Sequence, residues 1–157
     1  FWQTFAERTP AIVLVEPQTA GCWFDSLSAG HPTAVAGSLQ SIMAGLACGE
    51  VSYLAWKILR TGATAMMTIS DTVAEKSMRL LADQRQVDPP VVAGESGVAG
   101  LAGLIEAAND QQCRIMLGLD EKSRVLVFGT EGATDPESYH KIVGRPAHEV
   151  ASGRHKL

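Results

Sequence analysis

The pattern of apolar and polar residues divides the chain into short aliphatic runs and longer stretches in which apolar residues recur at helical spacing. The short runs are rich in β-branched residues, which is typical of buried strands. They cover residues 12–16 (IVLVE), 64–70 (TAMMTIS), 91–92 (VV) and 124–128 (RVLVF). The longer stretches predict helices over residues 1–8, 20–29, 51–60, 71–81, 98–109 and 137–143.

Strands and helices alternate along the chain, and this order predicts an α/β fold, a three-layer sandwich with a mostly parallel sheet. Residues 1–144 are expected to form one domain, whereas residues 145–157 are polar, lack periodicity and are expected to form a mobile tail. Ligands of such sheets bind beyond the carboxyl ends of the strands. That rule selects the positions Glu16-Pro17, Ser70-Asp71, Gly94 to Gly97 and Gly129 to Asp135.

Composition restricts the class of partner. The 157 residues are 46% apolar and 19% charged, which is ordinary for a globular protein with one core. The formal net charge of −4, without any long run of Lys or Arg, argues against nucleic acid as a partner. No apolar stretch reaches the roughly 20 residues needed to cross a bilayer, so we expect a cytoplasmic protein that does not bind a membrane.

Residue types that commonly carry metal, disulfide or nucleophilic chemistry show no informative spacing. Cys22, Cys48 and Cys113 fit neither a zinc pattern nor a disulfide framework, so we expect reduced thiols. A Cys22–Cys48 bond would require that the fold bring the two residues together. Lys57 and Lys76 lie on predicted amphipathic helices and are expected to be solvated, so neither is a convincing Schiff-base lysine. No metal site is predicted, and surface positions are expected for His31, His140, His148 and His155.

Two glycine-containing turns each lie between a predicted strand and a predicted helix. In the turn from Gly94 to Gly97, the backbone can approach a ligand closely and the helix N-terminus favours negative charge. The alternative is that Ser96 only caps the helix and the glycines only make a tight turn. The turn from Gly129 to Asp135 has the same two interpretations, a ligand site or a capped helix start. Two such turns in one small sheet favour a shared ligand.

The segment of residues 37–50, which lies between the first predicted strand and these two turns, is also unusual. Residues 37–50 (GSLQSIMAGLACGE) are small or apolar but do not form a clean amphipathic pattern. Small residues let a flat ligand lie against the backbone, and they equally let two helices pack closely. The residues alone leave both interpretations open.

Several short motifs occur in an order that is more specific than any one of them. They are VEPQTAGC, SIMAGLACGEVSYLAW, MRLLAD, GESGVAGLAGL and SRVLVFGTEGATDPESY, between about Phe1 and Gly144. In this order they resemble the diaminopropionate ammonia-lyases, which belong to the pyridoxal-phosphate enzymes of the tryptophan synthase β-subunit type, or fold type II. The resemblance implies an α,β-elimination that converts the small amino acid 2,3-diaminopropionate to pyruvate and ammonia, with pyridoxal 5′-phosphate (PLP) as cofactor.

The resemblance also implies which residues contact the cofactor. Met43, Ala44 and Gly45 match the loop that lies near the cofactor ring, and Glu95 with Ser96 matches part of the pocket wall. Gly129-Thr130 matches the strand end at which a hydroxyl faces the pyridine nitrogen. The related pattern has Ser first in this turn and Asp after its second glycine, whereas this chain has Gly129 and Ala133. Thr130 is therefore the expected hydroxyl, and Asp135 is expected to cap a helix and not to act as a base.

No catalytic residue is expected in this chain. In the family that it resembles, the Schiff-base lysine, the phosphate-binding loop and the acidic residues that handle protons precede the part matched here. We therefore expect the C-terminal portion of a lyase, inactive alone. Aromatic residues that an N-terminal cut would expose suggest a homodimer: Trp2, Phe5, Trp23 and Phe24. Alternatives are a fragment of a threonine or serine dehydratase-like PLP enzyme, and a non-catalytic small-molecule binding domain.

Overall fold

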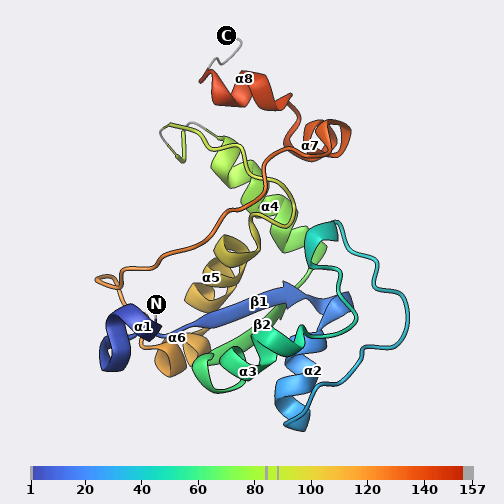
Figure 1. Cartoon of the computed structure of the whole chain (residues 1–157). Helices are drawn as coiled ribbons and strands as arrows, with labels where there is room; N and C mark the ends of the chain where they lie inside the picture. The colour runs from blue at the N-terminus through green and yellow to red at the C-terminus, as the bar shows by residue number, and fades with distance from the viewer. Residues whose placement is uncertain (1, 84, 88, 154–157) are drawn as a thin grey trace.

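The computed structural model describes residues 2–83, 85–87 and 89–153, whose helices and strands are arranged as in Figure 1. Within this part of the chain the sheet consists of β1 (Val13–Pro17) and β2 (Ala65–Ile69). The α-helices are α1 (Trp2–Phe5), α2 (Cys22–Ala29), α3 (Tyr53–Gly62), α4 (Asp71–Ala82), α5 (Ala99–Asn109), α6 (Gln111–Leu117), α7 (Pro136–Val143) and α8 (Ala147–Ala151). The 3₁₀ helices are η1 (Ala6–Arg8), η2 (Gln18–Ala20) and η3 (Ala44–Leu46).

The two strands are parallel and in register, with Val13 opposite Ala65 and Pro17 opposite Ile69. Val15 and Met67 point to one face, where they pack against Gly103 of α5; a Cβ on Gly103 would lie 2.7 Å from a Val15 methyl group. Their neighbours along the strands point to the other face because side chains alternate in a strand. Helices thus cover both faces of a parallel sheet (Figure 1), and the predicted α/β fold is confirmed.

A helical cluster extends from the sheet through α4. α7 packs against α4, and α8 follows it at the end remote from the sheet (Figure 1). Met78, Tyr139 and Val150 are fully buried there or nearly so. Arg79 Nε donates to the carbonyl of Ile142 at 2.8 Å, which joins the two longer helices of this cluster.

The predicted C-terminal tail is partly wrong. The segment after α7 forms α8, and Val150 anchors it in the core with no exposed surface. Arg145, at the beginning of this segment, donates a hydrogen bond to the carbonyl of Ala82. The short helix escaped the sequence pattern because five residues with only Ala147 and Val150 packed against the core give no helical periodicity. Residues 154–157, which include His155, lie outside the described residues.

The predicted strand over residues 124–128 is not part of the sheet. The segment has no strand partner in the described chain and runs along α5, where the side chain of Val127 would meet a Cβ on Gly100 at 3.5 Å. Leu126 and Phe128 are each 64% exposed. An apolar run predicts burial, but a strand also needs a neighbour with free backbone groups. The short strand predicted at Val91-Val92 does not form either.

Helix ends agree well with the predicted signals. Gly30 ends α2 in the left-handed conformation, with φ of 75°. Asp135 caps α7 by accepting hydrogen bonds from the amides of Glu137 at 3.1 Å and Ser138 at 3.0 Å, as expected. Gly62 is the last residue of α3, whereas the sequence pattern predicted that this helix ends at residue 60.

Candidate functional site

The loop of residues 41–46, named here the 41–46 loop, is held at its beginning by Asp71. Ser41 Oγ donates to Asp71 Oδ1 at 2.6 Å, and the amide of Ile42 donates to Asp71 Oδ2 at 3.1 Å. The amide of Met43 in turn donates to Ser41 Oγ at 3.0 Å. Asp71 is the first residue of α4 and follows β2 closely, so the carboxyl end of β2 fixes this end of the loop.

Ser96 holds the same loop near its other end. The amide of Gly45 donates to Ser96 Oγ at 3.0 Å. A Cβ on Gly45 would lie 3.0 Å from the same oxygen, so this close approach favours glycine. α5 has Val98 as its N-cap and receives no side-chain cap from it. The interpretation that Ser96 serves only as a helix cap is therefore wrong, because its hydroxyl joins two predicted ligand segments.

Glu131 joins the two glycine-containing turns. Its Oε2 accepts from the amides of Ser96 at 2.6 Å and Gly97 at 3.1 Å, and its Oε1 accepts from Thr134 Oγ1 at 3.1 Å. The amide of Gly94 donates to the carbonyl of Glu131 at 3.0 Å. The amides of Ser96 and Gly97, which precede the N-terminus of α5, therefore already bind a carboxylate of this chain. They are not open to an anionic ligand.

The glycines of the turn before α5 allow the backbone of Glu131 and Gly132 to cross directly over that turn. A Cβ on Gly94 would overlap the carbonyl oxygen of Gly132, and a Cβ on Gly97 would lie 2.5 Å from the carbonyl oxygen of Glu131. Gly129 also lies against this turn, since its Cβ would be 3.5 Å from the carbonyl oxygen of Gly97. The space beside these glycines, which the sequence predicted for a ligand, is thus filled by the backbone of the second turn.

The remaining predicted site residues differ in accessibility. The Met43 side chain is fully buried in the core, so only its backbone can face a ligand, whereas Ala44 and Gly45 are exposed. Glu95 is buried. Thr130 is exposed, and its hydroxyl has no hydrogen-bond partner within the described residues. The structure thus offers an open backbone surface at the loop and an unengaged hydroxyl on the turn that Glu131 anchors.

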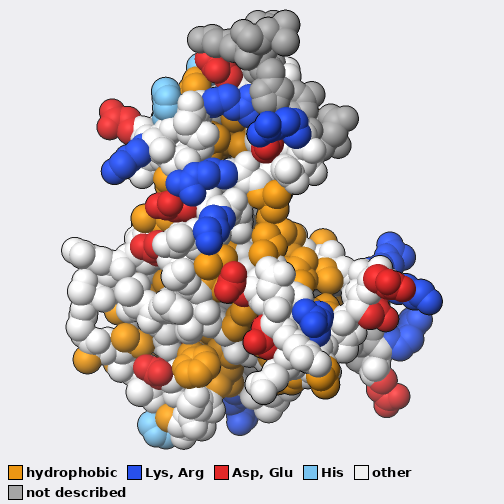
Figure 2. All heavy atoms as spheres, turned by 180° about the vertical axis from the view of Figure 1, so that it is seen from behind, with side chains coloured by type: hydrophobic (Ala, Val, Ile, Leu, Met, Phe, Trp, Pro, Cys, Tyr) orange, Lys and Arg blue, Asp and Glu red, His pale blue; other side chains and the backbone are white. Residues whose placement is uncertain are grey.

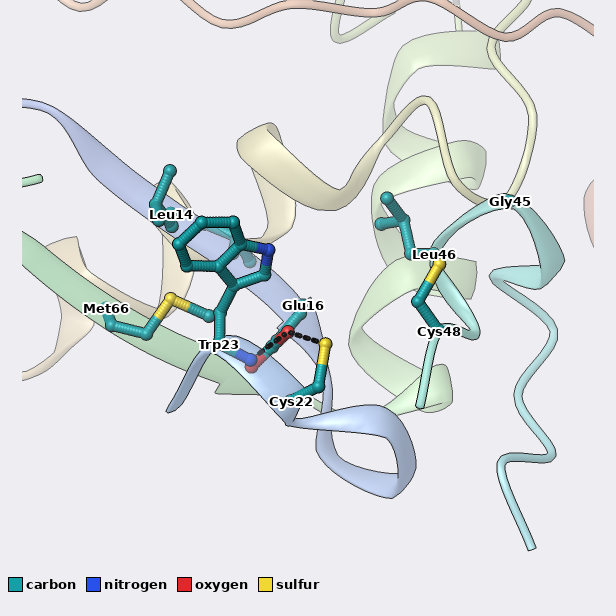
Figure 3. A pocket seen from close by; sticks show the side chains of 9 residues that line it. Leu14, Glu16, Cys22, Trp23, Gly45, Leu46, Cys48 and Met66 are labelled. Carbon is teal, nitrogen blue, oxygen red and sulfur yellow. Dashed lines mark hydrogen bonds between the residues drawn. The ribbon is translucent and has the colours of Figure 1, made fainter. Parts of the chain in front are cut away.

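A hollow of about 200 Å³ lies at the carboxyl end of β1 (Figure 3). Leu14, Trp23 and Met66 form apolar walls, and Gly45 and Leu46 of the 41–46 loop close another side. The loop therefore contacts two of the four positions selected from the sequence, Asp71 and Ser96. It lines one hollow together with Glu16 of the first position. The fourth position is joined to Ser96 by the Glu131 carboxylate.

Glu16 anchors the wall of the hollow. It is 6% exposed and accepts from the amides of Phe24 at 2.8 Å and Trp23 at 3.2 Å, at the beginning of α2. Burial raises the pKa of Glu16 above its ordinary value, although these two hydrogen bonds oppose the shift. Burial, followed by the charges of Glu16 and Cys48, raises the pKa of Cys22 to about 11. Cys22 is therefore a protonated thiol at neutral pH and a poor nucleophile.

The other residues that could carry chemistry are thiols, lysines and histidines. Cys22 is buried and Cys48 is exposed; both line the hollow, and both are free thiols. Lys57 and Lys76 are exposed, as expected from their helix faces. His31, His140 and His148 are exposed as well. In the described ranges, no three His, Cys, Asp or Glu side chains are grouped closely enough to hold a metal ion. No described helix has both the length and the apolar character needed to span a membrane.

Sequence reasoning missed the residues that connect the site. Ser41, Asp71 and Glu131 hold the 41–46 loop and the two turns together, and none of them was predicted as a site residue. A partial signal existed, since Asp71 lies at a selected strand end and Glu131 lies within a selected turn. Their partners are up to 35 residues away in the chain, so spacing could not reveal the contacts.

Comparison with known proteins places these features in a family. The family model described as pyridoxal-phosphate dependent enzyme matches residues 1–130. A curated diaminopropionate ammonia-lyase from Salmonella typhimurium is 39% identical over 155 residues, which cover 94% of this chain and 38% of that protein. The chain therefore spans little more than a third of that relative's length.

Solved structures agree with this relationship. The holo form of diaminopropionate ammonia lyase from Escherichia coli superimposes with a TM-score of 0.79 and 34% identity over 90% of this chain and 36% of that chain. Threonine deaminase isoform 2 from Solanum lycopersicum gives a TM-score of 0.72 at 19% identity, over 92% of this chain and 38% of that chain. At that identity the second similarity shows the fold alone.

Proposed function

Because this chain belongs to the family of pyridoxal-phosphate dependent enzymes, we propose that it forms the cofactor-ring side of a diaminopropionate ammonia-lyase. The observation that carries the proposal is the convergence of three segments. The 41–46 loop, the turn before α5 and the turn containing Thr130 are joined by the hydrogen bonds of Ser96 and Glu131. These are the segments that the resemblance assigns to the cofactor pocket.

The residues present fit one part of PLP. The exposed backbone at Ala44 and Gly45 has no bulky side chain, which suits contact with a flat aromatic ring. The Thr130 hydroxyl is available for the pyridine nitrogen. The amides of Ser96 and Gly97 are engaged by Glu131, so the turn before α5 is a poor cradle for the cofactor phosphate. The chain therefore fits the ring, and we propose that the phosphate is bound by other parts of the full-length protein.

Each of these residues has a proposed role in binding and orientation. PLP, when bound, would withdraw electrons from the substrate α-carbon, which makes the α-proton easier to remove and so prepares the loss of the β-amino group. The backbone of Met43 to Gly45 packs against one face of the ring. Thr130 contributes a neutral hydroxyl, which leaves the pyridine nitrogen largely unprotonated. Glu95 and Ser96 form part of the pocket wall.

We propose that the full-length protein converts 2,3-diaminopropionate to pyruvate and ammonia, and that this chain alone does not. Among the described residues, Lys57, Lys76, Lys122 and Lys141 are all exposed, a poor setting for a Schiff-base lysine. The lysine and the base that removes the α-proton would then come from residues outside this chain. A cytoplasmic homodimer completes the proposal; free thiols at Cys22, Cys48 and Cys113 suit a reducing compartment.

The test is a substrate comparison with the full-length protein. Two molecules of ammonia should form for each pyruvate from 2,3-diaminopropionate, and pyruvate should form faster than it does from serine or 2-oxobutyrate does from threonine. Thr130→Val should weaken PLP binding and alter its visible absorbance, whereas Thr130→Ser should preserve both. Preference for threonine would support a dehydratase, and failure to bind PLP would support a non-catalytic binding domain. Either result would overturn the proposed activity.

A further inference from the structure

We propose that Asp71 and Glu131 are positioning residues that clamp the 41–46 loop from its two ends and so set the position of its backbone against the cofactor ring. This inference rests on the proposed function, because that function makes the loop a ring-packing surface. Neither carboxylate touches the proposed ring surface directly. Each acts through a serine, Ser41 at one end and Ser96 at the other.

At the first end, Asp71 orients a hydroxyl that then binds the loop backbone. The 2.6 Å distance from Ser41 Oγ to Asp71 Oδ1 is that of a charge-assisted hydrogen bond. A serine hydroxyl has one proton, and donating it to Asp71 leaves the oxygen lone pairs for the amide of Met43 at 3.0 Å. The other carboxylate oxygen of Asp71 accepts from the amide of Ile42 at 3.1 Å. Both oxygens of Asp71 are therefore needed as acceptors.

At the second end, Glu131 fixes the residue that holds Gly45. Its Oε2 accepts from the amides of Ser96 and Gly97, which orients the Ser96 side chain toward the amide of Gly45. Both of these bonds reach a single oxygen. Glu131 also directly follows Thr130, so one residue connects the loop contact with the hydroxyl proposed for the pyridine nitrogen.

The loop depends on these external bonds because it has little structure of its own. Its regular backbone is limited to the three-residue helix η3, with the amide of Leu46 donating to the carbonyl of Met43 at 2.9 Å. The buried Met43 side chain fixes its depth in the core. Carboxylate-anchored contacts at both ends then leave Ala44 between two held amides. Such a supporting shell is what keeps a binding surface in one geometry.

The two carboxylates should respond differently to an amide substitution, and this difference is the test. Asp71→Asn replaces one carboxylate oxygen by an NH₂ group, which cannot accept from Ser41 or Ile42. With its oxygen kept toward the amide of Ile42, the hydrogen bond with Ser41 Oγ must reverse its direction, and both contacts lose the charge of the carboxylate. Glu131→Gln can keep its one essential oxygen toward both amides and turn its NH₂ group toward Thr134 Oγ1. We therefore expect Asp71→Asn to disturb the loop and Glu131→Gln to preserve it, whereas Glu131→Ala should disturb it.

The experiment uses the full-length protein and PLP itself as the probe. The apparent Kd for PLP should rise about tenfold in Asp71→Asn, Ser41→Ala and Glu131→Ala, the change expected when a charge-assisted hydrogen bond is lost. The visible absorbance band of bound PLP should shift in the same variants. Glu131→Gln and Ser41→Thr should behave as the wild type. Asp110→Asn is the matched control, because Asp110 caps α6 by accepting from the amide of Cys113 at 2.7 Å.

The outcomes separate this inference from the proposed function. Wild-type Kd and absorbance in Asp71→Asn, or equal losses in Glu131→Gln and Glu131→Ala, would overturn the clamp and leave the lyase proposal intact. Equal losses in the Asp110→Asn control would also overturn it, by showing a general effect of reduced stability. A wild-type protein that binds PLP but releases no pyruvate would overturn the proposed activity alone. A wild-type protein that does not bind PLP would overturn both.

Discussion

At the scale of single residues, the two glycine-containing turns explain one another. The turn before α5 needs Gly94 and Gly97 because the backbone of Glu131 and Gly132 passes directly over it. Sequence reasoning recognised both turns and the close approach that their glycines permit. It could not recognise that each turn is the other's neighbour, since the residues in contact are more than 30 positions apart. The glycines are therefore structural before they serve any ligand.

Because the two turns cross here, substitutions of the two glycines at this contact should differ in their effect on the free energy of unfolding. Gly94→Ala would place a methyl group on the carbonyl oxygen of Gly132 and should lower the free energy of unfolding by about 1–3 kcal/mol. Gly132→Ala meets no atom within 4 Å and should change it by less than about 0.5 kcal/mol. Urea unfolding followed by circular dichroism measures both. Equal losses in the two variants would contradict the crossing.

The buried hydroxyl of Tyr139 gives a second prediction at this scale. Tyr139 is fully buried, and its hydroxyl has no hydrogen-bond partner in the part of the chain that the structure describes. A buried polar group without a partner carries a desolvation cost of about 1–3 kcal/mol. Tyr139→Phe should therefore leave Tm unchanged or raise it, as measured by differential scanning calorimetry. A clear fall in Tm would mean that the hydroxyl has a partner.

At the scale of elements, the sequence predicted what local signals determine. Helices with a capping residue were found near their true ends, as for Asp135 at α7 and Gly30 at α2. The strand over residues 124–128 was wrong because its apolar pattern says nothing about which strand pairs with it. α8 was missed because the burial of Val150 is a tertiary contact. Local chemistry thus fixes element type, whereas pairing and docking depend on distant residues.

Glu16 of β1 should make the stability of the folded chain depend on pH. Its raised pKa means that the folded state holds the proton more tightly than the unfolded state does. The contribution of this proton to stability is complete below the ordinary carboxyl pKa of about 4.3 and is lost as pH rises through the raised value. The wild type should therefore lose stability relative to Glu16→Gln as pH rises across this window.

Urea unfolding at a series of pH values measures this difference. Glu7→Gln, at an exposed carboxylate, is measured beside it as the control for the loss of one carboxyl group. A wild type that gains stability relative to Glu16→Gln with rising pH would show that the amides of Trp23 and Phe24 outweigh burial.

At the scale of the whole molecule, large apolar side chains remain at the surface. On α3, Tyr53 is 72% and Leu54 is 73% exposed, and Leu126 and Phe128 are each 64% exposed. Hydrophobic side chains also reach the surface over the middle of the rear face, while Lys and Arg gather in the upper part of the molecule and at its right-hand edge (Figure 2). Exposed apolar groups of this kind are typical of surfaces that contact other protein.

These surfaces predict that the 157-residue chain self-associates in solution. Analytical ultracentrifugation should show a sedimentation coefficient that rises with protein concentration. The double variant Leu54→Lys/Leu126→Lys should weaken this dependence, whereas Lys57→Arg on the same helix should not. A clean monomer at every concentration would contradict the prediction.

The candidate site was predictable in outline and not in its connections. The order of motifs predicted that Gly45, Ser96 and Thr130 contact one cofactor, which stays a prediction, and the structure joins the first two by a hydrogen bond of 3.0 Å. The roles of Asp71 and Glu131 required the fold, because a carboxylate that supports a loop has no spacing signature. The contact of Thr130 with a pyridine nitrogen stays a prediction.

The most direct test of the proposed ring-packing role is a crystal structure of the full-length protein with PLP bound. We expect the PLP ring in van der Waals contact with the backbone of Met43 to Gly45, and the Thr130 hydroxyl within hydrogen-bond distance of the pyridine nitrogen. The Glu131 carboxylate should still bind the amides of Ser96 and Gly97, with the phosphate held outside this chain. A ring bound away from the 41–46 loop, or a phosphate seated on the turn before α5, would contradict it.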